Sequence, residues 1–335
     1  MDEVDVRILR ELAQDPPIAP SGTQFRKSFA VTAKVVGLDE DTVRKHVRWF
    51  HDVGLIERWR TVVNPTLFGG GEVALRIDVK PPTSKDDVVE KLRLLPGVVL
   101  LVRFHGTLIA VVFRYYDEVA LRRLIELVRR IAEVDRLHAA RIPFPSCAIR
   151  VSKTDWDILR TLDDNPRKPY VAVSRELGLS SRTVRRALRR IAEEGAAFAY
   201  PALNPRAVPG GVMAALFVTY PAELKREIER RIATELDAYL WHVFHMLPYE
   251  PSEPLPCLFN LVLPNVASAR EVLRWTKRMP GVREARIDLF EDIETSFEAF
   301  DEEMKKRIGR LPARLPMARA RRRVDGRNDA TAREG

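Results

Sequence analysis

The chain has 335 residues, 46% of them hydrophobic, so it is long and apolar enough to form several compact domains. Its apolar runs fall short of the roughly 20 residues that a membrane helix needs, and its acidic start is unlike a secretion signal. These features argue against disorder and predict a cytoplasmic protein with no membrane partner. Lysine and arginine outnumber aspartate and glutamate by 56 to 47, a net charge of +9, which favours a polyanionic partner where the excess is clustered.

The two cysteines, Cys147 and Cys257, lie far apart and have no CxxC or Cys/His spacing around them. This pattern predicts neither a zinc site nor a disulfide framework and fits a reducing compartment. No Ser/His/Asp set, carboxylate pair or other catalytic cluster stands out. We therefore predict a protein that is not an enzyme, with no catalytic residue, cofactor or metal.

An internal repeat sets the domain organisation. Residues 5–10 match 155–160 at an offset of 150, and residues 37–54 match 178–195 at an offset of 141 with seven identities in eighteen positions. The change of offset places an insertion of nine residues around 16–22, where prolines and a glycine are typical of a surface loop. The repeated unit is about half of the chain.

After the first sixty or so residues of each copy, helical periodicity gives way to alternating strands and helices. The first copy predicts strands at 73–79, 98–104, 108–115 and 136–142 and helices at 84–95 and 117–132. The second copy predicts strands at 212–220, 239–246, 257–263 and 283–290 and helices at 222–236 and 267–279. This β-α-β-β-α-β order is ferredoxin-like, and the second copy adds a proline-rich loop at 247–256.

The predicted fold class is α+β, with two winged helix-turn-helix domains that are each followed by a ferredoxin-like domain. The predicted bounds are 1–66 and 152–206 for the helix-turn-helix domains and 72–147 and 211–296 for the ferredoxin-like domains. A basic tail at 311–335 lacks apolar periodicity, which is typical of disorder. This tail either adds non-specific DNA affinity or is only a solvated end.

The first helix-turn-helix contains a turn glycine, Gly37, and a following helix with the apolar stripe Val43, Val47 and Phe50. Three carboxylates crowd the start of this helix, where they suit the helix dipole but repel a phosphate backbone. We therefore expect this copy to bind DNA more weakly or to read a different half-site. Its predicted contacts are Thr42, Arg44, Lys45 and Arg48.

The second helix-turn-helix has the better defined pattern. Gly178 permits a tight turn between two helices, and Ser180 is a natural N-cap for the second of them. A stripe of Val184, Leu188 and Ile191 is expected to be buried, which leaves the arginines on the other sides of the helix. Its predicted DNA contacts are Ser181, Arg182, Thr183, Arg185, Arg186, Arg189 and Arg190.

An arginine-rich exposed helix face suits the major groove, because forked guanidinium groups read guanine edges while flanking arginines neutralise phosphates. A charge run alone is more often a solvated helix face. The turn glycine, the cap and the upstream helix at 171–177 favour the DNA-binding interpretation. Double-stranded DNA is therefore the predicted partner.

A short apolar hairpin that ends in Asn-Pro is predicted after each of these helices, at 55–65 and 197–205. These hairpins would be the wings. Arg58 and Arg60 lie in the first of them, where they either contact phosphates or are ordinary exposed strand residues. Arg58 is included among the predicted DNA contacts.

Both copies resemble the Lrp/AsnC (feast/famine) regulators. The pattern Leu-Gly-Leu-Ser-x-x-Thr-Val that begins at Leu177 is typical of that family, in which the helix-turn-helix precedes a ferredoxin-like effector domain. The resemblance covers residues 2–147 and 152–295, and in the effector domains it is only topological. It implies a sequence-specific DNA-binding transcriptional regulator.

In that family two chains pair through their effector-domain sheets, and amino acids or related metabolites bind near the interfaces. The resemblance therefore implies an intrachain pseudo-dimer, alone or in a larger homo-oligomer, that responds to an amino-acid-like or other small effector. Two different readers in one chain favour an asymmetric operator. The family's glycine and acidic residue after the second strand are replaced here by 105–107 and by the long loop, which argues against an ordinary amino-acid pocket.

The alternative is a siroheme decarboxylase-like enzyme acting on a modified tetrapyrrole, since such enzymes use the same tandem fold and depend on histidines at the ends of second strands. His105 and His245 occupy these places and are the only candidate ligand-binding residues. His242 is expected on the strand face opposite His245, so these two do not readily share a metal. An arginine-rich recognition helix has little use in such an enzyme, and its arginine-and-histidine motif is not evident, so the regulator is favoured.

Overall fold

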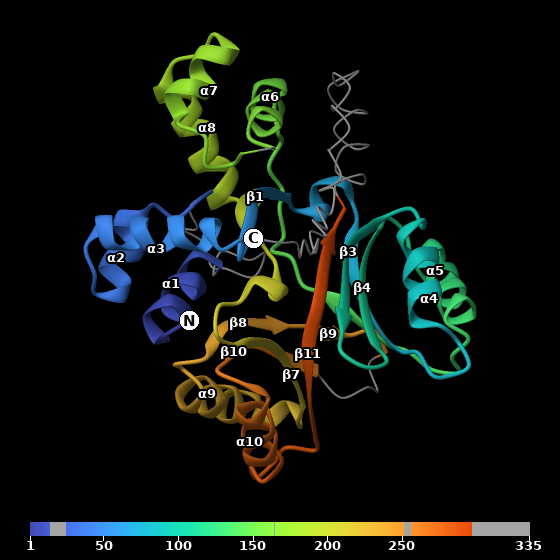
Figure 1. Cartoon of the computed structure of the whole chain (residues 1–335). Coiled ribbons are helices and arrows are strands. Elements are labelled where there is room, and N and C mark those ends of the chain that lie inside the picture. Colours follow the sequence, from blue (N-terminus) through green and yellow to red (C-terminus); the bar gives the residue numbers. More distant parts are fainter. Residues whose placement is uncertain (14–24, 164, 251–255, 297–335) are drawn as a thin grey trace, which may run out of the picture.

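The computed structural model describes residues 1–13, 25–163, 165–250 and 256–296 (Figure 1). The insertion predicted around 16–22 and the basic tail predicted at 311–335 lie outside the described residues. Within the described ranges, every helix is too short or too polar to span a lipid bilayer.

Two sets of three helices form where the sequence predicts the helix-turn-helix segments. The first helical domain consists of α1 (Glu3–Ala13), α2 (Phe29–Val36) and α3 (Glu40–Asp52). The second helical domain consists of α6 (Lys153–Thr161), α7 (Tyr170–Leu177) and α8 (Ser181–Glu193). Gly37 and Gly178 end the middle helices with φ of 77° and 64°, a left-handed turn that redirects the chain into the third helix.

The remaining elements follow the β-α-β-β-α-β order in both halves. The first sheet domain contains β2 (Gly71–Asp78), α4 (Lys85–Arg93), β3 (Val98–Phe104), β4 (Leu108–Tyr115), α5 (Glu118–Ile131) and β5 (His138–Ile142). The second sheet domain contains β7 (Val212–Thr219), α9 (Lys225–Glu235), β8 (Leu240–His245), the short β9 (Leu247–Pro248), β10 (Pro256–Leu263), α10 (Val266–Lys277) and β11 (Glu284–Thr295). Short 3-10 turns at Pro65–Phe68, Pro205–Ala207 and Ala222–Leu224 connect some of these elements.

The two sheet domains share one nine-stranded sheet with the order β8-β10-β7-β11-β3-β4-β2-β5-β9. β11 joins the halves, because its first part pairs with β7 and its second part pairs with β3, where Phe290 lies opposite Phe104. β9 follows β8 in the chain and pairs with β5, so the two ends of the sheet meet. α4 and α5 cover the first half and α9 and α10 the second (Figure 1).

The apolar residues between the halves form a core of their own. Phe104 and Phe217 face each other edge-on at 6.1 Å between ring centroids, and Phe104 also contacts Phe290 at 4.9 Å. Val102, Leu108 and Ala215 complete this buried cluster. Because burial of aromatic side chains is among the larger stabilising contributions in proteins, the two sheet domains form one packed body.

The predicted wing hairpins are not formed. Each predicted hairpin is instead one strand, β1 (Ile56–Val63) and β6 (Ala197–Leu203), and the two strands pair antiparallel with each other. Arg60 lies opposite Tyr200 in this pair and is only 9% exposed, and burial lowers its pKa to about 10. Arg60 therefore cannot contact phosphates from this position, whereas Arg58 is half-buried.

The two helical domains are placed differently on the sheet. The core of the first domain continues into the second sheet domain through Trp241 and Val262, and Arg10 on α1 forms an ion pair of 2.8 Å with Asp237. Figure 1 shows α1 near β8, whereas α6, α7 and α8 extend away from the nine-stranded sheet. The first helical domain thus packs on the second sheet domain through α1, and the second helical domain stands apart from the nine-stranded sheet.

A segment of the first half completes the core of the second helical domain. Phe25, which is 2% exposed, packs with the apolar residues of α6, α7 and α8, and its carbonyl accepts a hydrogen bond of 2.6 Å from the Ala199 N–H. In the other direction, the Arg167 guanidinium stacks over the Trp59 ring at 3.9 Å. These reciprocal contacts hold the two helical domains together.

Candidate nucleic-acid interface

α8 has one apolar face and one cationic face. Val184, Leu188 and Ile191 are buried in the core of the second helical domain, as the sequence predicts. The opposite face presents the exposed side chains of Arg182, Arg185, Arg186 and Arg189. Because α8 begins with Ser180 as an N-cap that accepts a hydrogen bond from the Thr183 N–H, its first turn is fixed without any acidic residue.

The four arginines Arg182, Arg185, Arg186 and Arg189 are hereafter called the α8 arginines. In the part of the chain that the structure describes, none of them has a carboxylate within ion-pair distance. Four adjacent cations without internal neutralisation attract a polyanion and release its counterions on contact. Their forked N–H donors also suit phosphate oxygens and guanine edges.

Arg190, although predicted as a DNA contact, is ion-paired within the protein. Its guanidinium lies 2.5 Å from the carboxylate of Asp155 on α6, whose side chain is 3% exposed. Asp155 also closes a capping box with Ser152 at the start of α6. Arg190 therefore fixes α8 against α6 and positions the neighbouring arginines.

Asp155 is expected to contribute stability that depends on pH. Burial alone would raise the pKa of Asp155, but hydrogen bonds from Ser152 and Arg190 outweigh burial and leave this pKa below its ordinary value. A lowered pKa in the folded state means that the contribution is present at neutral pH and is lost as the pH falls through that folded pKa.

We therefore expect Asp155→Ala to lower the free energy of unfolding by about 1–2 kcal/mol at pH 7, with most of this difference gone near pH 3. Urea unfolding of both proteins at the two pH values measures it. Asp237→Ala, which removes an exposed partner of Arg10, is the control and should cost less than about 1 kcal/mol. An Asp155→Ala effect that is the same at both pH values would contradict this account.

The predicted hydroxyl contacts are occupied by local hydrogen bonds. The Thr183 hydroxyl lies 2.9 Å from that of Ser180, and the Ser181 hydroxyl lies 3.1 Å from that of Ser174. In α3, the Thr42 hydroxyl donates to Asp39 at 2.6 Å. These three hydroxyl groups stabilise the helix starts, and their role toward DNA remains a prediction.

α3 carries fewer available charges than α8. Arg44 is neutralised by Glu40 at 2.5 Å and by Asp41 at 3.8 Å. Lys45 and Arg48 are exposed and, among the described residues, have no acidic partner. The carboxylates at the start of α3 thus reduce its cationic character, in line with the expectation of weaker binding.

Sequence reasoning missed how the third helix of each helical domain is anchored. His46 on α3 lies 2.7 Å from the buried carboxylate of Asp5 on α1, just as Arg190 lies against Asp155. The repeat aligns Asp5 with Asp155, but their partners do not align, because the position equivalent to Arg190 is Trp49, three residues after His46. The sequence did carry a signal for this anchoring, because Asp5 and Asp155 occupy matching positions near the starts of α1 and α6.

Comparison with known proteins places the chain in a family. A family model described as winged helix-turn-helix DNA-binding matches residues 151–196, which include α6, α7 and α8. The HTH-type transcriptional regulator Ptr1 of Methanocaldococcus jannaschii is 26% identical over 169 residues, 50% of this chain and 99% of Ptr1. An uncharacterized HTH-type transcriptional regulator of Pyrococcus abyssi is 31% identical over 134 residues, 40% of this chain and 75% of the relative. This chain belongs to the HTH-type transcriptional regulators.

A solved structure extends the likeness of this HTH-type regulator to nearly the whole chain. The siroheme decarboxylase NirDL, in co-complex with an iron-uroporphyrin III analogue, is 15% identical with a TM-score of 0.53, over 90% of this chain and 98% of NirDL. At this identity the likeness concerns the fold alone. The same fold serves an enzyme, so the function of the regulator has to be argued from its side chains.

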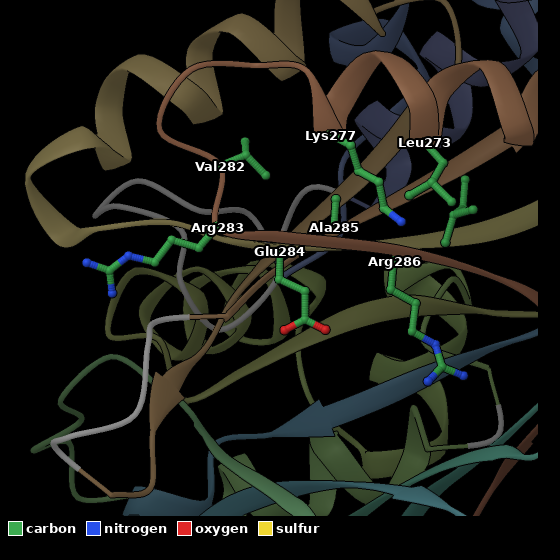
Figure 2. A pocket seen from close by; sticks show the side chains of 8 residues that line it. Leu273, Lys277, Val282, Arg283, Glu284, Ala285 and Arg286 are labelled. Carbon is green, nitrogen blue, oxygen red and sulfur yellow. The ribbon is translucent and has the colours of Figure 1, made fainter.

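The regulator also has an open hollow of about 580 Å³ between α10 and the start of β11. Figure 2 shows Lys277 and Leu273 descending from α10, with Glu284 and Arg286 on the far face of the strand. Arg286 forms an ion pair of 2.7 Å with Asp78 on β2, so this strand end also contacts the first sheet domain. Neither His105 nor His245 lines this hollow.

The two candidate ligand-binding histidines lie far apart. His105 is exposed in the β3–β4 turn, whereas His245 ends β8. Four strand steps separate β3 from β8 in the sheet order, which at the usual strand spacing is roughly 19 Å along the sheet. At this separation His105 and His245 cannot both bind one atom of a ligand.

Proposed function

We propose that the chain is a sequence-specific regulator of transcription that binds double-stranded DNA through α8. The observation that carries the proposal is the row of exposed α8 arginines, without acidic partners among the described residues, on a helix whose other face is buried. The membership of the chain in the HTH-type transcriptional regulators supports it. The position of the second helical domain, away from the nine-stranded sheet, supports it as well.

In this proposal the first half of α8 enters the major groove. Arg182, Arg185 and Arg186 lie in that half, where side chains of a recognition helix reach base edges. Arg189 lies one turn further along, where phosphates of the groove wall are within reach of a long side chain. Arg190 contributes indirectly, because it holds α8 in place through Asp155.

We further infer that the chain is a tandem duplication that acts as an intrachain pseudo-dimer of the Lrp/AsnC type. The repeated element order, the pairing of β1 with β6 and the continuous sheet support this inference. The match of nearly all of Ptr1 to half of this chain agrees with it. Because the α3 and α8 surfaces differ in charge, we expect them to bind different half-sites, which together form an asymmetric operator.

The α3 surface should make the smaller contribution. Replacing Lys45 and Arg48 together with alanine removes at most two phosphate contacts, so the slope of log affinity against log salt should become shallower by about 2. The loss should be similar for operator and unrelated DNA. Fluorescence anisotropy with labelled duplexes measures both, and a loss confined to the operator would contradict the secondary role of α3.

A small effector remains part of the proposal. The hollow between α10 and β11 offers the Lys277 ammonium group to an anionic metabolite. Arg286 on the same stretch of β11 contacts the first sheet domain, which suits a coupling role. An effector bound there would act on the junction of the two halves. Thermal shift screening with amino acids and organic acids tests for it.

Genome-wide mapping of bound sites tests the proposed function as a whole. The proposal expects discrete sites in promoter regions that share one asymmetric sequence motif. The same motif should be recovered by selection from random duplexes with the purified chain. Uniform coverage without a shared motif would contradict sequence-specific regulation.

The enzyme alternative has its own test. The fold of NirDL supports it, but the α8 arginines have no role in it. Incubating the purified chain with siroheme should leave the Soret absorption unperturbed and yield no decarboxylated product. Turnover of siroheme would support the enzyme alternative and contradict the proposal of a regulator.

A further inference from the structure

Three side chains in the second sheet domain meet at one point. Glu229 comes from α9, His245 from the end of β8 and Cys257 from the start of β10. Strand pairing sets Cys257 opposite His245, and an ion-pair contact brings Glu229 of α9 to His245. One oxygen, one nitrogen and one sulfur atom from these residues all lie within 4.8 Å of one another.

The spacing of these atoms is close to that of a metal coordination shell. The His245 Nδ1 atom lies 3.2 Å from a Glu229 carboxylate oxygen and 4.0 Å from the Cys257 Sγ. In tetrahedral zinc sites, bond lengths of about 2.0–2.3 Å place ligand atoms about 3.3–3.6 Å apart. The two distances from His245 Nδ1 lie on either side of these values.

The surroundings also suit a metal centre. Cys257 is 1% exposed, and its thiol donates a weak hydrogen bond of 3.7 Å to the Phe244 carbonyl oxygen. The hydroxyl of Tyr220 donates to the Glu229 carboxylate, a second contact that orients a metal-binding carboxylate. His245 and Glu229 are half-buried, which leaves one side of the group open.

We propose that Glu229, His245 and Cys257 bind one divalent transition-metal ion of the zinc class and leave a fourth position open. On binding, the Cys257 S–H bond breaks, a sulfur–metal bond forms and the proton passes to solvent. Mixed sulfur, nitrogen and oxygen ligands select zinc-like ions over magnesium or calcium. This site revises the expectation of no metal, which rested on the absence of a short Cys/His spacing in the sequence.

The proposed metal site is connected to the first sheet domain through β9. Only Met246 separates His245 from β9, which pairs with β5 of the first sheet domain. Tyr249, shortly after β9, packs on the core of that domain and donates a hydrogen bond of 3.2 Å to the Ala139 carbonyl oxygen. A metal that fixes His245 would therefore stabilise the closure of the sheet. Its effect on transcription rests on the proposed DNA-binding function.

The repeat predicts one metal ion per chain. His105 occupies the equivalent place in the first half, but it is exposed and its neighbourhood among the described residues forms no comparable group. Cys147, the other free cysteine, lies in the segment before α6. His105 and Cys147 therefore provide matched controls.

Cobalt titration of the untagged, full-length chain tests the site. We expect one Co²⁺ per chain, with a thiolate-to-cobalt charge-transfer band, release of a proton and displacement of cobalt by Zn²⁺. Cys257→Ser should abolish the band, and His245→Ala should weaken cobalt binding at least tenfold. Cys147→Ser and His105→Ala should bind like the unaltered chain.

Glu229→Gln, which keeps the shape of the side chain, covers the case in which Cys257→Ser does not fold. It should keep the band and weaken cobalt binding roughly tenfold or more. Absence of the band in the unaltered chain, or its loss in Cys147→Ser in place of Cys257→Ser, would overturn the site. DNA binding by the metal-free chain is measured separately, so a failed metal site with intact DNA binding leaves the proposed function standing.

Discussion

Replacing Arg185 and Arg186 together with alanine is expected to weaken binding of the chain to its operator by roughly 30-fold or more. Each well-placed guanidinium discriminates a base by about 1–3 kcal/mol, so two of them account for about 2–6 kcal/mol. Both side chains are exposed on α8 and support no internal ion pair in the described chain, so the fold should survive their removal. Fluorescence anisotropy with operator and unrelated duplexes gives the two affinities.

The matched control is Arg230→Ala with Arg231→Ala on α9, which removes the same charge from an exposed helix of the second sheet domain. This control should lose little operator affinity. Equal losses for the two double variants would mean that net charge alone drives binding, and would remove α8 as the reader of sequence.

Phe25→Ala is expected to lower the free energy of unfolding of the second helical domain by about 3–5 kcal/mol, as for other large buried aromatic side chains. Phe25 belongs to the first half by sequence, yet it packs in the core of α6, α7 and α8. Urea unfolding should show the loss, and hydrogen exchange should quicken in α6 and α8 before the sheet. Operator binding should weaken in parallel, because α8 needs this core.

Leu94→Ala serves as the control for Phe25→Ala, since the Leu94 side chain is 84% exposed. Its removal should change stability by no more than about 0.5 kcal/mol. A Phe25→Ala loss below about 1 kcal/mol would show that the two helical domains are not interlocked in the way that the structure describes.

Local patterns in the sequence predicted the helices and strands well. The turn glycines, the caps and the apolar stripe of α8 depend only on residues within a few positions of one another, and all are observed. The β-α-β-β-α-β order was likewise readable, because period-two and period-3.6 patterns alternate cleanly. The bounds of the domains themselves remain predictions.

Contacts between distant segments were beyond the reach of these patterns. β11 was predicted to end at residue 290, yet it continues through a largely polar stretch to Thr295. Its polar side chains are neutralised by the first sheet domain, where Glu294 pairs with Arg93 and Glu291 with Lys85. A strand that pairs with another domain does not need a locally apolar sequence.

The same reason explains what the sequence patterns did not reveal at the candidate sites. The wing hairpins failed because each strand found its partner in the other half of the chain, about 140 residues away in sequence. Arg190 was assigned to DNA because its partner, Asp155, lies on another helix. Cys257 and His245 are brought together by strand pairing, which no fixed spacing reveals.

The most direct test of DNA binding by the α8 arginines is the affinity of the unaltered chain for duplex DNA as salt is raised from about 50 to 200 mM. If these four arginines displace counterions, the logarithm of affinity should fall linearly with the logarithm of salt, with a slope of about −4 or steeper. A flat response, with no binding to duplex DNA at low salt, would contradict the central claim.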